Sequence, residues 1–278
     1  MPGEATAVSL VDAGRGRWRV EIHCRDAPDK DALRTLAVVA AGSKAGTVLR
    51  FARLAPRDWV GESLAGLKPV AAGRFIVHGA HDRLRIPVNR IGIEIEAALA
   101  FGTGHHGTTR GCLLALDRLH RSLGNGLAPA RVLDLGTGSG VLAIAAARAF
   151  RRRVLATDID AVAVRAARDN ARRNRAGPSI EVVQANGLNA PAIRAGAPFD
   201  LVFANILLEP LQRLAAPLAK IIAPGGRVVL SGLLSAQANA AIAAYRGLSP
   251  GLAPGLALER RIVLDGWTTL VLKRAAAC

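Results

Sequence analysis

A glycine-rich segment, DLGTGSG, begins at Asp134 and lies between an apolar segment and an apolar helical pattern. Gly136, Gly138 and Gly140 allow a sharp turn and a close approach of the backbone to a ligand. The GxGxxG spacing of dinucleotide-binding proteins is not met, because Val141 occupies the position of its last glycine. Asp134 adds a carboxylate at the strand end, which is unfavourable for a pyrophosphate and favourable for a ligand ammonium. The segment therefore predicts a site for a cationic ligand.

A second carboxylate, Asp158, ends the next apolar segment, RRVLATD. An acidic residue about 20 positions after the first glycine can accept both hydroxyl groups of an adenosine ribose. Asp160 stands two residues further on and is interpreted as the N-cap of the following helix. S-adenosylmethionine has both an adenosine ribose and a zwitterionic methionine with a sulfonium, so we predict it as the cofactor.

A third polar residue, Asn205, ends the segment FDLVFAN. Its amide could accept a hydrogen bond from a substrate amine while a neighbouring carbonyl takes another, which would aim the nitrogen lone pair at a methyl group. Methyl transfer is an in-line displacement that depends mainly on positioning a neutral amine. The alternative is that Asn205 only caps the helix expected to start near Leu208.

The segment FGTGHHGTTRG, residues 101–111, allows three interpretations: a phosphate cradle, a metal site, or a flap over a small molecule. A phosphate-binding loop would need GK[ST], which is absent. The adjacent residues His105 and His106 diverge, and no third ligand stands at a suitable spacing, so we expect no metal. We expect a loop that can fold over the cofactor, with Thr108 and Thr109 capping the next helix.

The elements that must position these residues alternate between strands and helices from about residue 90 onward. Such alternation predicts a mostly parallel sheet covered on both faces, that is, an α/β fold. The tail breaks the pattern, because two strands around Asp265 and Gly266 read as an antiparallel hairpin that closes the sheet edge. Ligands of such sheets bind beyond the carboxyl ends of the strands, where the strand order reverses.

The N-terminal part has a different pattern, typical of a small α+β domain. Its segments are expected as a strand, a helix and a second strand, in this order: RWRVEIH (17–23), DALRTLAVVAAG (31–42) and TVLRFARL (47–54). We therefore divide the chain into a small α+β domain at 1–55, a linker at 56–72 and the cofactor-binding domain at 73–278.

The composition of the chain bears on its binding partners and on its location in the cell. A formal charge of +16 is consistent with weak contact to RNA or the ribosome, although the Arg and Ala bias of the sequence could produce it alone. Cys24, Cys112 and Cys278 are widely separated, which argues against a disulfide framework. The N-terminus does not resemble a secretion signal, and no apolar run approaches the ~18 residues of a membrane span. We expect a cytoplasmic monomer.

Four segments, in this order and spacing, resemble a known family: AFGTGHHGTTRGCLLALD, VLDLGTGSGVLAIAAARA, ATDIDAVAVRAARDN and ANILLEPL. They are similar to the bacterial methyltransferases that modify ribosomal protein L11 of the large subunit. The resemblance extends from about residue 57 to near Ser235, and the N-terminal unit matches in position and size more than in sequence. The threonine loop combined with ANIL is specific, whereas DxGxGxG alone would fit any class I methyltransferase.

The resemblance implies an S-adenosylmethionine-dependent N-methyltransferase with a Rossmann-like class I sheet, acting on lysine and α-amino groups of ribosomal protein L11. It also implies that Thr109, Gly136, Asp158 and Asn205 occupy the family's cofactor-binding positions. In the family, the small N-terminal domain is joined by a mobile linker and captures the protein substrate.

One departure from the family pattern is visible. The form FGTGTHPTT reads FGTGHHGTT here, with His105 and Gly107 in place of a threonine and a proline. Two rival functions remain: a class I methyltransferase acting on RNA or a small molecule, which the charge supports, and a non-catalytic ribosome-binding protein. ANIL in place of an NPPY-type tetrapeptide disfavours the first, and the intact acidic and amide residues disfavour the second.

Overall fold

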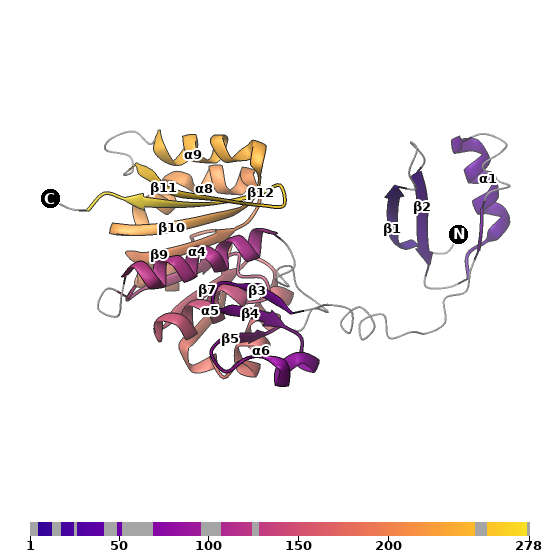
Figure 1. Cartoon of the computed structure of the whole chain (residues 1–278). Coiled ribbons are helices and arrows are strands. Elements are labelled where there is room, and N and C mark those ends of the chain that lie inside the picture. Colours follow the sequence, from indigo (N-terminus) through magenta and orange to yellow (C-terminus); the bar gives the residue numbers. More distant parts are fainter. Residues whose placement is uncertain are drawn as a thin grey trace. The chain divides into compact units, whose positions relative to one another are not determined.

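The computed structural model describes residues 5–12, 18–24, 27–41, 49–51, 69–95, 107–123, 128–247 and 255–276. The chain forms two compact units, Met1–Arg57 and Asp58–Cys278, which we describe separately (Figure 1). Among the described residues, none of the helices is both long and apolar enough to cross a membrane.

The N-terminal unit contains an antiparallel pair of strands, β1 (Ala5–Asp12) and β2 (Trp18–Cys24), followed by helix α1 (Lys30–Ala41). The Asp29 carboxylate accepts hydrogen bonds from two amides of the first turn of α1, which fixes where that helix begins. Strand β1 was not expected from the sequence. Within the expected strand 47–54, residues 49–51 form no regular secondary structure, and the other positions lie outside the described residues.

The second unit is built on a seven-stranded sheet with the order β11-β12-β10-β9-β6-β7-β8. Its parallel strands are β6 (Val132–Leu135), β7 (Val154–Asp158), β8 (Ile180–Gln184), β9 (Phe199–Asn205) and β10 (Ile222–Leu234). The antiparallel edge consists of β11 (Leu256–Leu264) and β12 (Trp267–Arg274). The predicted α/β class, with its mostly parallel sheet and C-terminal hairpin, is therefore confirmed.

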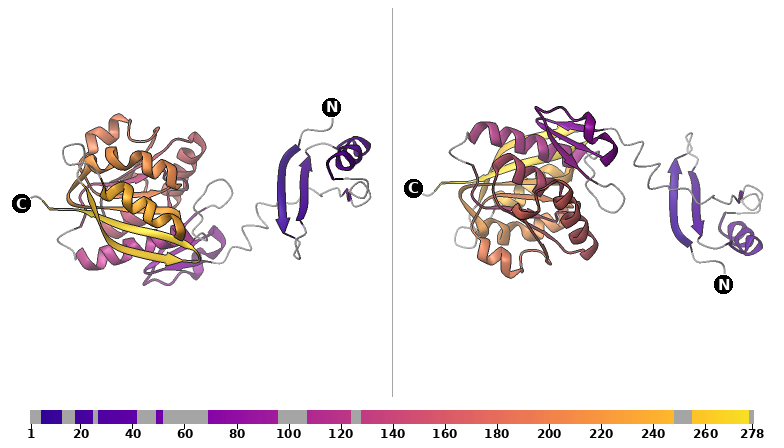
Figure 2. Two further views of the ribbon diagram at one scale, coloured as in Figure 1. Left: turned by 90° about the horizontal axis from the view of Figure 1, so that it is seen from above. Right: turned by 90° about the horizontal axis from the view of Figure 1, so that it is seen from below.

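Helices cover both faces of this sheet (Figure 2). They are α4 (Gly107–Leu123), α5 (Val141–Phe150), α6 (Ala161–Arg173), α7 (Pro191–Gly196), α8 (Leu208–Ile221) and α9 (Ala238–Arg246). Side chains of α4, α5 and α6 belong to one apolar cluster, and those of α7, α8 and α9 belong to the other. Successive strand residues alternate between the two clusters; Val202 faces one and Phe203 the other, because side chains of a strand point to opposite faces. The central strands are therefore buried on both sides.

A second, three-stranded sheet precedes the large one along the chain. Strand β3 (Val70–Ala72) pairs antiparallel with β4 (Phe75–His78), and β4 pairs parallel with β5 (Ile91–Glu94). A short 3-10 helix, η1 (Ala80–Arg85), lies between β4 and β5. Of these elements only β4 falls in a segment, RFIVHG (74–79), whose sequence predicts a strand. Strand β3 occupies the last three residues of the stretch that we expected to be linker, because Gly73 at φ +60° turns the chain into a hairpin.

Candidate functional site

The strand order of the large sheet reverses beside β6. From β6 the chain continues to β7 and β8 on one side, and then to β9 and β10 on the other. Leu135, the last residue of β6, pairs with Thr157 of β7 and with Ala204 of β9. Asp158 and Asn205 each come one residue later, so both lie at the same sheet edge, on either side of the glycine-rich loop. This edge is where α/β sheets bind ligands.

The glycine-rich loop makes the sharp turn that the sequence predicts. The three glycines at 136, 138 and 140 have left-handed φ angles of +69°, +55° and +83°. The Gly136 amide donates to the Thr157 carbonyl at 2.8 Å, which ties the loop to the neighbouring strand. A Cβ atom at Gly136 would lie 2.6 Å from Ile206 Cγ2, so a larger residue would displace the segment after β9. The loop therefore needs glycine for conformation and for space.

Asp134 lies beneath this loop with only 1% of its surface exposed. Its Oδ2 accepts hydrogen bonds from Thr137 Oγ1 at 2.6 Å and from the Ala143 amide at 3.0 Å. Burial raises the pKa of Asp134 to about 6, against the opposing effect of these two hydrogen bonds. The carboxylate thus joins the loop to the first turn of α5, and its expected contact with a ligand ammonium stays a prediction. The sequence did not single out Thr137, whose role depends on this contact.

Asp158 is partly exposed at the end of β7. Its Oδ2 accepts from the Gly138 amide at 2.8 Å, and its Oδ1 accepts from the Asp160 amide at 3.0 Å. Each carboxylate oxygen has a second lone pair, so the group can still accept two hydroxyl groups. Asp160 in turn caps α6 by accepting from the Val162 amide at 2.8 Å, which confirms the interpretation of Asp160 as an N-cap.

The structure brings Asn205 and Thr109 together. Asn205 Nδ2 donates to Thr109 Oγ1 at 3.4 Å, across 96 positions of sequence. Thr109 is fully buried, whereas Asn205 is partly exposed. The N-cap of α8 is Leu207, and no side chain makes a capping hydrogen bond there. Asn205 therefore does not serve as the helix cap that the sequence allowed as an alternative.

Helix α4 packs closely on the C-terminal hairpin at the end that carries Thr109. A Cβ atom at Gly111 would lie 2.2 Å from Thr269 Oγ1, and one at Gly107 would lie 3.0 Å from the Leu264 carbonyl oxygen. Thr108 and Thr109 lie inside the first turn of α4 and not ahead of it, so the expected capping by these threonines is wrong. Their neighbour Gly107 is already helical, which extends the helix beyond the predicted start.

The rest of the histidine segment, residues 101–106 with His105 and His106, lies outside the described residues. The expectation that it folds over a ligand is not tested. Within the described parts of the chain, histidine, cysteine and carboxylate side chains form no group of three or more that could hold a metal ion.

The family pattern described as ribosomal protein L11 methyltransferase (PrmA) matches residues 18–275. The chain belongs to this family. Proteins named ribosomal protein L11 methyltransferase from Rhodopseudomonas palustris (strain BisB5) and Bradyrhizobium diazoefficiens are 53% and 52% identical to it. Each alignment spans 268 residues, which is 96% of this chain and 88% of the relative. The chain is accordingly a methyltransferase, and its methyl donor is S-adenosylmethionine.

A solved structure of this family has a similar fold. It is that of a ribosomal protein L11 methylase from Lactobacillus delbrueckii subsp. bulgaricus, with a TM-score of 0.62 and 27% sequence identity. The similarity covers 75% of this chain and 100% of that one.

The described residues include groups that suit the chemistry of the methyl donor. The carboxylate of Asp158 keeps acceptor lone pairs at the end of β7, beside the Gly138 amide to which it is bonded. Ile159, the next residue, is 64% exposed, so an apolar side chain also lies at the surface beside this carboxylate.

Proposed function

We propose that this chain transfers methyl groups from S-adenosylmethionine to lysine ε-amino and α-amino groups of ribosomal protein L11. The observation that carries the proposal is the contact between Asn205 and Thr109 at the reversal point of the sheet, beside the glycine-rich loop. The names of its relatives support the choice of protein substrate.

The donor would be held by residues on the β6 and β7 side of the site. Asp158 would accept the ribose hydroxyl groups, and the backbone at Gly136 and Gly138 would lie against the methionine portion. The buried charge of Asp134 would favour the donor's ammonium group. When bound, the donor supplies a methyl group activated by the adjacent sulfonium.

The acceptor amine would be oriented from the β9 side. Because Asn205 Nδ2 donates to Thr109, its Oδ1 remains as an acceptor for the substrate N–H. Such a hydrogen bond directs the amine lone pair toward the donor methyl group, and orientation of this kind contributes much of the rate in bimolecular group transfer. Asn205 is uncharged and does not take the proton, so the amine would lose it to solvent before the transfer.

The N-terminal unit would capture the protein substrate. Val20 and Ile22 are 56% and 49% exposed on β2, and Leu36 and Val39 are 55% and 80% exposed on α1. Exposed apolar side chains at this density support a role in protein binding. We further propose that the enzyme is a cytoplasmic monomer, and that its charge of +16 supports weak contact with RNA or the ribosome.

The test is to incubate the enzyme and methyl donor with purified ribosomal protein L11 and then record the mass of that protein. We expect added methyl groups on its amines, and a rate at least about tenfold lower with Asn205→Ala, which loses amine orientation together with part of the donor contact. Parallel reactions with ribosomal RNA serve as the comparison. Methylation of RNA with ribosomal protein L11 unmodified would overturn the proposal.

A further inference from the structure

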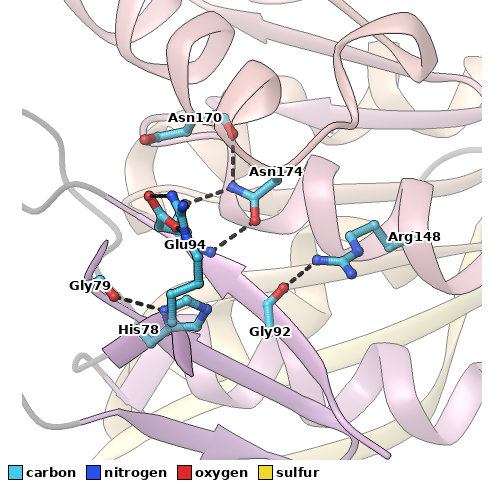
Figure 3. A network of polar contacts seen from close by, with 8 residues as sticks. His78, Gly79, Gly92, Glu94, Arg148, Asn170 and Asn174 are labelled. Carbon is cyan, nitrogen blue, oxygen red and sulfur yellow. Dashed lines mark hydrogen bonds and ion pairs between the residues drawn. The ribbon is translucent and has the colours of Figure 1, made fainter. Parts of the chain in front are cut away.

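The end of strand β5 is held by the side chain of one residue, Asn174, the C-cap of α6. Asn174 Oδ1 accepts from the Glu94 amide at 2.9 Å, and Asn174 Nδ2 donates to the Glu94 carbonyl at 2.7 Å. Figure 3 shows the asparagine lying between Glu94 and Asn170. The side-chain amide thus pairs with both backbone groups of Glu94, as a neighbouring strand would. The contact joins elements 80 positions apart in the sequence.

The same helix face holds the glycine-rich loop. Asn170, one turn before Asn174, is 3% exposed and donates from Nδ2 to the Ser139 carbonyl at 2.9 Å. Asn174 Nδ2 also donates to the Asn170 carbonyl at 2.8 Å. A Cβ atom at Gly140 would lie 3.2 Å from the Ala167 backbone, so the loop packs directly on α6. Helix α6 therefore connects the glycine-rich loop to the end of β5.

Two further contacts fix β5 from other elements. The Glu94 carboxylate is bound by Arg83 of η1 through Nε at 2.7 Å and Nη2 at 2.9 Å. These hydrogen bonds hold the pKa of Glu94 below its ordinary value, although burial opposes them. Arg148 of α5 donates to the Gly92 carbonyl (Figure 3). Strand β5 is thus held by α5, α6 and η1.

One face of α6 therefore supports two neighbouring parts of the molecule. Asn174 holds Glu94 at the end of β5, and Asn170, one turn earlier, holds the glycine-rich loop at Ser139.

We propose that Asn174 is a positioning residue for the methyl-donor site, acting through α6 on the glycine-rich loop. The inference rests on the donor site proposed above. It predicts that loss of the Asn174 amide weakens donor binding while the rate of the chemical step changes little, because Asn205 keeps its place on β9.

The experiment compares the full-length Asn174→Ala variant with Asn239→Ala. Asn239 lies on α9 and accepts from Arg261 Nη2 at 2.7 Å, so the control also loses one side-chain hydrogen bond, away from the site. We expect the Asn174 variant to bind S-adenosylmethionine about tenfold more weakly in calorimetry, with kcat within about twofold of wild type. The control should match wild type in both.

Amide hydrogen exchange without any ligand gives a second measurement. In Asn174→Ala we expect faster exchange at residues 136–140, in addition to 91–95. A purely structural role would lower the melting temperature and accelerate exchange at 91–95 alone, with donor affinity within about twofold of wild type. That outcome would overturn the inference. If Asn174→Ala does not fold, Asn174→Ser is measured in its place, because serine keeps a polar group at the helix end but cannot reach both groups of Glu94.

A parallel measurement on Asp158→Ala tests the donor site independently of Asn174. If Asp158→Ala binds the donor weakly while Asn174→Ala binds it normally, the inference about Asn174 is wrong and the donor site stands. If Asp158→Ala binds the donor as wild type does, the donor site itself is wrong, and the positioning role of Asn174 falls with it.

Discussion

Asp158 is the residue whose loss should affect the donor most directly. Its two oxygens accept from the Gly138 and Asp160 amides, and in the proposed site their remaining lone pairs would accept the ribose hydroxyl groups. We expect Asp158→Ala to bind S-adenosylmethionine at least about tenfold more weakly, because two hydroxyl groups lose a charge-assisted acceptor worth roughly 1.5 to 3 kcal/mol. Calorimetry measures this directly.

Asp160→Ala is the matched control for that measurement. It removes the cap of α6, which should lower stability by about 1 kcal/mol and leave donor affinity close to wild type. Equal affinity of Asp158→Ala and wild type would rule out the ribose assignment.

At Asp134, the effect of the negative charge on donor binding can be measured apart from the effect of its two hydrogen bonds on folding. The single oxygen Oδ2 accepts from both Thr137 and Ala143, so the amide oxygen of Asp134→Asn can keep both hydrogen bonds. We expect the variant to fold as wild type does and to bind the donor more weakly, because the charge opposite the ligand ammonium is gone. Unchanged affinity would restrict Asp134 to holding the loop.

The pH dependence of stability supplies a second measurement on Asp134. Its pKa is raised from 3.8 to about 6 in the folded protein, so between these values the folded state binds more protons than the unfolded state. This group therefore makes the wild type less stable as pH rises from about 4 to about 6. Relative to wild type, Asp134→Asn should gain in melting temperature across that range, and a constant difference would contradict the shifted pKa.

The acceptor amine imposes its own pH dependence on the reaction. A lysine ammonium with a pKa near 10.4 must lose its proton before it can attack, and Asn205 does not remove it. We expect the single-turnover rate to rise between about pH 7 and pH 9. A flat profile under conditions in which chemistry limits the rate would indicate that a side chain takes the proton.

At the scale of elements, the close packing of α4 on the hairpin makes Gly111 sensitive. An alanine Cβ there would clash with Thr269 Oγ1, and Thr269 is 1% exposed and bonded to Ser231. We expect Gly111→Ala to destabilise the protein by about 1 to 3 kcal/mol and to weaken donor binding, because α4 must shift together with Thr109. Thermal denaturation and calorimetry test the two effects.

Two further variants test whether the clash with Thr269 causes the effects of Gly111→Ala. Gly177→Ala adds a Cβ only 3.8 Å from Arg172 Cγ, an ordinary contact, and should leave both properties near wild type. Combining Gly111→Ala with Thr269→Ala removes the clashing hydroxyl group and should recover part of the loss. A double variant no better than Gly111→Ala alone would show that the clash is not the cause.

The elements differ in how far the sequence predicts them. The alternating strands and helices of the large sheet, and the hairpin at Asp265 and Gly266, have long periodic patterns that specify them locally. Strands β3 and β5 are only three and four residues long, and β5 contains a glycine, so their patterns are too short to recognise. They form because they pair with β4, a tertiary effect.

The site residues also differ in how far the local sequence predicts them. Asp134, Asp158 and Asn205 each stand at or near the end of an apolar segment, which is a local signal of a strand end. Thr137 and Asn174 carry no such signal, because Thr137 depends on the conformation of a loop and Asn174 on a strand 80 positions away. Side-chain contacts with distant backbone groups cannot be inferred from spacing along one sequence.

At the scale of the whole molecule, substrate capture and donor binding should be separable. The compact unit Asp58–Cys278 contains every residue proposed for the donor site, and Met1–Arg57 contains none. We expect a chain starting near Arg57 to bind S-adenosylmethionine normally and to methylate intact ribosomal protein L11 orders of magnitude more slowly, because the tether no longer raises the local concentration of substrate. Donor affinity measured in parallel controls for misfolding. Methylation at the full-length rate would refute capture by the N-terminal unit.

The position of β12 in the sheet has a consequence for folding during translation. This strand lies between β10 and β11, and its Thr269 packs directly against Gly111 of α4. Residue 111 leaves the ribosomal exit tunnel long before residue 269 does. A nascent chain that carries all of the glycine-rich loop, Asp158 and Asn205 therefore still lacks the strand on which the first turns of α4 pack. We expect competence to hold the methyl donor to arise late in translation, after β12 has emerged from the ribosome.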